Sequence, residues 1–291
     1  MTVSSEMSLL SINVKPNRAA CWTLSWLLFA TGITLYFYTA QRRHKDNPDD
    51  RVVPTLAQLG AGIYQAAMNP DADEEQPSDA ASQSAFERFR HSMLWTDTVA
   101  SSRRFFYGLA LLFPAVLLGL HMGIFPYFGV FFLRFILFFD KIIALSVLPI
   151  LFIAFGIDEL SKVMLIVIGV TPTIILDTFN LTKGVPPEQL VKGFTLGASD
   201  FDVAYRVVLK QIWPRVLNSI RLNLKPLMLF LFAGEMIAST DGLAYRIALL
   251  RRHMGMNIII PYVLWVALLL FLVDLSMRLL NRKLHPWFRE A

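Results

Sequence analysis

The sequence predicts an all-α, polytopic membrane protein with about six transmembrane helices. Of its 291 residues, 55% are hydrophobic and only 17% are charged, whereas a soluble domain carries about 25% charged residues. The mean hydropathy is +0.51, and several uncharged runs are long enough to cross roughly 30 Å of hydrocarbon at about 1.5 Å per residue. This composition excludes an ordinary soluble globule.

The first uncharged run, residues 21–40, is the first predicted span, and residues 1–20 form a cytoplasmic N-terminal segment. A cleaved signal peptide is the alternative, because Lys15 and Arg18 precede the run. The run is long for the apolar region of a signal, however, and ends in aromatic residues before Gln41-Arg42-Arg43. We therefore favour a retained span.

Residues 41–104 are predicted to form a periplasmic polar segment with short amphipathic helices. Leu56, Leu59 and Ile63 recur at helical spacing, and so do Phe86, Phe89 and Met93. Between these sets, residues 71–79 hold five acids and no base. That stretch is either a solvated loop or a docking patch, and the solvated loop is favoured.

Five further spans are predicted within a core formed by residues 105–291. They are residues 105–125, 142–157 (kinked at Pro149 and open to extension back through 127–139), 163–176, 216–238 and 258–280. Proline and glycine recur inside them, and such residues are tolerated where neighbouring helices satisfy the freed backbone groups. The pattern favours a packed bundle with a pathway over isolated anchors.

Basic residues in the short loops predict the orientation. The loop at residues 181–215 and the C-terminal end are both rich in lysine and arginine, so both should be cytoplasmic, together with the N-terminus. The loop at residues 239–257 then lies outside despite Arg246, Arg251 and Arg252, which is the one conflict. The net charge of +5 is explained by these loops, and a nucleic-acid partner is not expected.

The loop at residues 181–215 predicts two short amphipathic helices joined by a tight turn. Pro186 and Pro187 open the first helix, and Gly197 is placed as a left-handed stop. Ser199, followed by Asp202, resembles a capping box that starts the second helix. Such a pair makes a compact knob suited to a groove on another protein.

Three stretches resemble the permease subunits of binding-protein-dependent ABC importers. Leu196-Gly-Ala-Ser, Val207-Val-Leu-Lys-Gln-Ile-Trp-Pro and Ile220-Arg-Leu-Asn-Leu resemble the EAA loop of that family. The run from Leu148-Pro-Ile-Leu to Leu160-Ser-Lys, with Gly234-Glu-Met, Asp241-Gly-Leu and Asp274, resembles the nitrate, sulfonate, taurine and bicarbonate branch. The Glu-Ala-Ala triplet itself reads Val191-Lys-Gly here, and Lys210 replaces a family proline.

The resemblance implies a type I importer permease in the bacterial inner membrane that carries a small solute, with a small anion or sulfonate expected. Its implied partners are a second permease copy, two cytoplasmic ABC ATPase subunits, a periplasmic solute-binding protein and the lipid bilayer. ATP and magnesium are expected on the ATPase, with no cofactor on this chain. The implied ATPase-coupling residues are Val191, Lys192, Gly193, Phe194, Leu196, Gly197, Ala198 and Ser199.

Several further residues are candidates for function or for packing. Glu235 lies in an apolar stretch and is either a pathway or gate residue or a structural ion-pair partner. Asp140, Asp177 and Asp274 are expected to cap helices or form salt bridges. Arg221 and Lys225 are expected to extend toward the cytoplasm.

Catalytic motifs are absent from the sequence. It holds no phosphate loop, no G-x-S-x-G and no H-E-x-x-H, and its single cysteine excludes a disulfide framework. The chain is therefore expected to be a transport subunit without enzymatic activity or a metal site. The alternative is an intramembrane enzyme or a non-transport membrane scaffold.

Overall fold

The computed structural model describes residues 18–46, 52–68, 85–252 and 255–288, and the acidic stretch 71–79 lies outside them. The described residues form helices and turns with no strand. The chain divides into two units, residues 1–58 and 59–291, which are described separately. The helices are α1 (Arg18–Asp46), α2 (Leu56–Met68), α3 (Ala85–Arg90), α4 (Met93–Ala110), α5 (Leu112–Ile124), α6 (Pro126–Asp140), α7 (Ala144–Phe155), α8 (Glu159–Lys183), α9 (Pro187–Thr195), α10 (Asp200–Asp202), the π-helix η1 (Val203–Val208), α11 (Leu209–Leu222), α12 (Leu224–Ala238), α13 (Leu243–Arg252) and α14 (Met256–Leu284).

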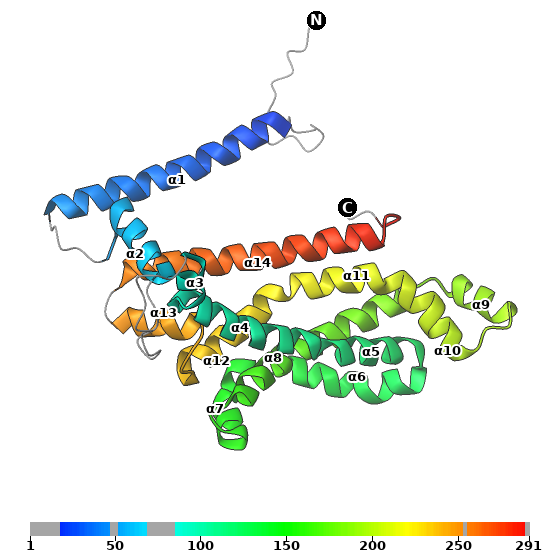
Figure 1. Cartoon of the computed structure of the whole chain (residues 1–291). Helices are drawn as coiled ribbons and strands as arrows, with labels where there is room; N and C mark the ends of the chain where they lie inside the picture. The colour runs from blue at the N-terminus through cyan, green and yellow to red at the C-terminus, as the bar shows by residue number, and fades with distance from the viewer. Residues whose placement is uncertain (1–17, 47–51, 69–84, 253–254, 289–291) are drawn as a thin grey trace, which may run out of the picture. The chain divides into compact units, whose positions relative to one another are not determined.

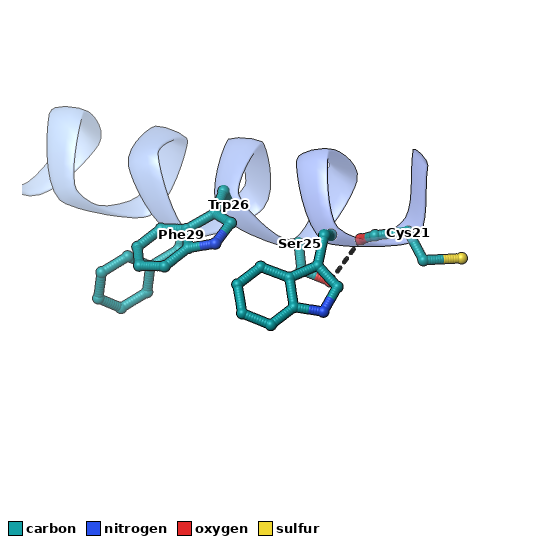
Figure 2. A pocket seen from close by; sticks show the side chains of 5 residues that line it. Cys21, Ser25, Trp26 and Phe29 are labelled. Atoms are coloured by element: carbon teal, nitrogen blue, oxygen red, sulfur yellow. Dashed lines mark hydrogen bonds between the residues drawn. The ribbon is translucent and has the colours of Figure 1, made fainter. Parts of the chain in front are cut away.

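The first unit is dominated by the apolar helix α1. Its hydroxyl groups bond back to its own backbone, as Ser25 does to the carbonyl of Cys21 at 2.9 Å. Trp26 and Phe29 project from one side of the helix and pack edge to face (Figure 2). A helix in hydrocarbon must satisfy its polar groups internally and present apolar side chains to the lipid, and α1 does both.

Five helices or continuous helical segments are long and apolar enough to cross a membrane, and a bent pair raises the number to six. The expected count of about six is therefore confirmed. The bent pair is α6 and α7, which meet at 95° across residues 141–143. The strongest bend thus precedes Ala144 rather than falling at Pro149, which lies inside α7. The charged pair Asp140–Lys141 ends α6 at this point.

Two expected boundaries differ from the observed helices. The second span begins at Met93 and includes α4 and α5, so the expected start of the core at residue 105 lies inside a helix. The fifth span was expected to begin at residue 216, but α11 begins at Leu209 and runs through Pro214. The helical segment breaks at Asn223, whose side-chain amide donates to the carbonyl of Ser219 at 2.9 Å. Asp97, Thr98, Ser101 and Arg104 concealed the first boundary because these polar residues are buried within the protein rather than exposed to water.

The core of the second unit lies where α5 and α8 pack along each other and against α11 and α12. Val116, Leu120, Ile166, Ile174 and Leu227 are fully buried there. Figure 1 shows α9 and α10 at one end of this unit and α7 and α13 at the other. The residues that the sequence singled out for function lie at these two ends: the coupling residues at the α9–α10 end and Glu235 at the α13 end.

Candidate functional site

The knob comprises α9, α10 and the turn between them. Its turn is a Schellman motif: Gly197 has φ +83°, its N–H donates to Phe194 O at 2.9 Å, and the Ala198 N–H donates to Gly193 O at 3.2 Å. No side chain fills the space beside Gly197, so its positive φ is the requirement for glycine there. The left-handed stop expected at this position is confirmed.

Ser199 starts the second helix of the knob. Its hydroxyl oxygen accepts from the Asp202 N–H at 3.2 Å and its hydroxyl donates to the Asp202 carboxylate at 2.7 Å. Asp202 in turn pairs with Arg206 at 3.1 Å, one turn further along. The cap and the ion pair together fix where α10 begins.

The knob carries an apolar surface that the described chain leaves largely exposed. Val191 is 59% exposed, Phe194 47%, Leu196 82% and Phe201 64%. We call these four residues the knob patch. Large apolar side chains gathered on one exposed turn are typical of protein–protein contact sites.

The knob and η1, which follows it directly, each contact α5 of the bundle. The ring of Phe201 lies 5.9 Å from that of Phe125 at the end of α5. The hydroxyl of Tyr205 lies 3.1 Å from Nε2 of His121, also on α5. Displacement of the knob would therefore act on α5 as well as on the helices joined to it through the backbone.

A network of buried charges occupies the α13 end, with Arg104 at its centre. Arg104 is fully buried, and its guanidinium bonds to Glu159 through Nε at 2.6 Å, to Glu235 through Nη1 at 2.9 Å, and to Asp241 through Nη2. Lys162, also buried, bonds to Glu159 at 3.2 Å. These contacts join α4, α8 and α12 to the loop before α13.

Asp97 anchors a second part of the same network. Its carboxylate accepts from the Gly242 N–H at 3.1 Å, from Arg246 Nε at 2.9 Å and from the Tyr262 hydroxyl at 3.1 Å. Arg246 therefore forms an ion pair with a buried carboxylate and is not a solvated charge in a loop. This observation removes one of the three arginines that conflicted with the predicted orientation.

Gly242 is the closest backbone approach in this network. It has φ +118°, and a Cβ there would lie 2.7 Å from Glu235 Cδ and 2.8 Å from Arg104 Nη1. Only glycine allows the backbone to reach the two charges in this conformation. The Asp241-Gly242-Leu243 motif is thus explained by packing around an ion pair.

Glu235 is fully buried, and its carboxylate accepts hydrogen bonds from three protein groups. Besides Arg104, it accepts from the Ser101 hydroxyl at 2.7 and 2.9 Å and from the Ala244 N–H at 3.1 Å. This geometry fits the structural ion-pair interpretation. A role in the pathway or gate stays a prediction.

The other acids named from the sequence form the packing contacts expected of them. Asp274 pairs with Arg221 at 3.3 Å and with Arg278 at 2.7 Å, so Arg221 is held inside the bundle. Asp177 bonds to Ser219, and Asp140 pairs with Lys141 at 2.9 Å.

Sequence reasoning missed Arg104, Asp97 and Ser101. They recur at positions 97, 101 and 104, which is the spacing of one helix face, and that polar stripe was the available signal. Among the residues that the structure describes, no group of three or more His, Cys, Asp or Glu side chains is placed to hold a metal ion.

Comparison with known proteins identifies the class to which this bundle and knob belong. Residues 115–286, more than half of the chain, match the family described as the binding-protein-dependent transport system inner membrane component. The chain belongs to this family. It is a permease subunit of an ABC importer, a transport role without enzymatic activity, in a multi-pass membrane protein.

Two curated relatives and one solved structure are informative. The taurine transport system permease protein TauC of Escherichia coli K12 is 29% identical over 207 residues, covering 70% of this chain and 74% of TauC. The putative aliphatic sulfonates transport permease protein SsuC of Bacillus subtilis is 32% identical over 143 residues, covering 49% and 52%. An inward-facing structure of the MetNI methionine ABC transporter matches with TM-score 0.52 and 16% identity, covering 65% and 93%, which supports the fold.

Proposed function

We propose that this permease imports a small organosulfonate, such as taurine or an aliphatic sulfonate, delivered by a periplasmic binding protein. The proposal is supported by the names of two relatives, TauC and SsuC, which come from different organisms and agree on the sulfonate group. Gly234-Glu-Met and Asp241-Gly-Leu, which resemble motifs of the nitrate, sulfonate, taurine and bicarbonate branch, also support a sulfonate solute.

The knob is the proposed docking site for the ATPase, and this is the observation that carries the coupling mechanism. The knob patch is apolar and exposed on a rigid turn, and it lies at the end of the bundle opposite α13. We assign this end to the cytoplasm, together with both chain termini. ATP and magnesium are held by the ATPase, and this chain contributes the surface from Val191 to Ser199.

The assembled transporter is proposed to contain two copies of this permease, two ATPases and one binding protein. ATP binding and the binding protein both favour the outward-open state, because each has higher affinity for it than for the inward-open state. Closure of the ATPase dimer moves the knobs, and the contacts of Phe201 and Tyr205 with α5 pass that motion into the spans. Hydrolysis then resets the inward-open state and releases the solute.

A competition experiment tests the proposed solute. The permease and its ATPase are reconstituted in liposomes with ATP and the ATPase on the inside. The binding protein is added outside, and uptake of radiolabelled taurine is measured. Excess unlabelled aliphatic sulfonate should suppress uptake, whereas the matching carboxylate should not. Absence of ATP-dependent uptake for every sulfonate would overturn the assignment of solute class, and the family membership would stand.

A further inference from the structure

Three helical segments of similar length, in α4–α5, in α8 and in α11–α12, indicate which part of the second unit spans the hydrocarbon. From Arg104 to Ile124, from Lys162 to Lys183 and from Glu235 back to Arg215 the chain covers about 20 residues, which is roughly 30 Å of helix. That distance equals the thickness of the bilayer core. The buried charge network therefore marks one edge of the hydrocarbon slab, and the α9–α10 end marks the other.

Lys225 lies near the middle of this slab. It is in the first turn of α12, about ten residues from Glu235 on one side and from Arg215 on the other, so each edge is about 15 Å away. The four-carbon stem of lysine is much shorter than this depth, so its ammonium does not reach the headgroups. The expectation that Lys225 extends to the cytoplasm does not fit this placement.

The side chain of Lys225 is exposed, on a face of the helix that the bundle leaves uncovered. Leu229, one turn further along and 58% exposed, and Met236, 39% exposed, lie on the same face. The opposite face, with Leu224, Leu227 and Leu231, is buried in the core. An ammonium at this depth is strongly disfavoured against lipid and by default faces a water-filled cavity.

Three other basic side chains in or at the edge of the slab form ion pairs. Arg221, one turn before Lys225, pairs with Asp274, and Arg104 and Lys162 belong to the charge network. Arg134 is also exposed, but it lies nearer to an edge of the slab than Lys225 does, about 12 Å along α6 from the start of that helix. In the described chain, no ion pair is formed by Lys225.

We propose that Lys225 lines the aqueous translocation pathway and transiently binds the sulfonate group of the solute. The ammonium is a single charge on a flexible side chain, so it can attract an anion without the bidentate hydrogen bonding of an arginine. The exposed face of α12 would then be turned toward the second permease copy, with the pathway between them. The solute contact rests on the proposed import of organosulfonates, whereas exposure to water does not.

Thiol labelling tests exposure to water. In a Cys21→Ser background, Lys225→Cys is introduced, and the assembled transporter in liposomes is treated with an anionic, membrane-impermeant methanethiosulfonate. Phe271→Cys, at an exposed site on α14 among the exposed Leu264, Leu268 and Leu275, is the control. We expect the thiol at 225 to react and the thiol at 271 to stay unmodified. No reaction at 225, in the presence or absence of ATP, would overturn the pathway assignment.

Uptake measurements test the contact with solute. Lys225→Gln should lower the initial rate of taurine uptake at least about tenfold, with co-purification of the ATPase and ATPase stimulation by the binding protein unchanged. Lys225→Arg should restore most of the rate. Normal uptake by Lys225→Gln would overturn the solute contact, and loss of the permease dimer would assign Lys225 to a contact between copies instead.

Discussion

Arg104 is buried among three carboxylates, and its removal would leave Glu235 without its counterion in a site closed to water. Breaking a buried pair costs about 3–5 kcal/mol, whereas an exposed pair contributes about 0–1 kcal/mol. Arg104→Gln should therefore lower the free energy of unfolding by several kcal/mol. Arg103→Gln, which removes only an exposed contact of 3.8 Å to Glu159, is the matched control. Unfolding in mixed micelles measures both, and equal effects would contradict the central role of Arg104.

Glu235→Gln separates the two interpretations of this carboxylate. The amide still accepts from Ser101 and the Ala244 N–H, but it no longer balances the charge of Arg104. We expect lower abundance in the membrane and a lower melting temperature, with normal uptake per assembled transporter. Normal abundance with altered uptake would instead place Glu235 in the gate.

Gly197→Val tests the turn of the knob. A β-branched residue at φ +83° is strained by about 1–2 kcal/mol, which should reorient Phe194 relative to Phe201 and weaken ATPase docking. Gly197→Asn is the control, because asparagine tolerates the left-handed conformation. Co-purified ATPase and ATP-driven uptake are measured together. Equal docking by the valine and asparagine variants would show that the conformation of this turn is not required.

At the scale of elements, α13 is held by its first turn. Gly242→Ala would place a Cβ against Glu235 and Arg104 and should release α13 from α4 and α12. Gly255→Ala, where a Cβ would make only ordinary contacts of 3.5 Å or more, should be harmless. The readout is trypsin cleavage at Arg251 and Arg252, both of them exposed. Similar cleavage rates in the two variants would contradict this account of the loop.

The sequence was sufficient to predict elements whose determinants are local. Apolar length predicted the spans, and Gly197, Ser199 and the proline pair at 186–187 predicted the knob because caps and turns depend on neighbouring residues. The start of α4 and the bend after Asp140 were missed. Asp97 and Arg104 are polar in the sequence, and their burial depends on partners between 55 and 165 residues away. Local patterns do not reveal such contacts.

At the scale of the whole molecule, the predicted orientation has a direct test at the two ends of the bundle. In a Cys21→Ser chain, Lys192→Cys on the knob should react with an impermeant maleimide only in inverted membrane vesicles. Arg251→Cys on α13 should react only in intact cells. Both residues are exposed, so accessibility depends on the side of the membrane. The reverse labelling pattern would overturn the assignment of the knob to the cytoplasm and, with it, ATPase docking there.

The charge network has a consequence for how the protein is made. Arg104 leaves the ribosome before Glu235, its buried partner, which lies 131 residues further along the chain. At about 5–20 residues per second, translation of that interval takes on the order of ten seconds. During this time α4 carries a guanidinium into the membrane without the carboxylate of α12. The insertion machinery must shelter this helix, or hold it near the headgroups, until α12 and α13 emerge and close the network around it.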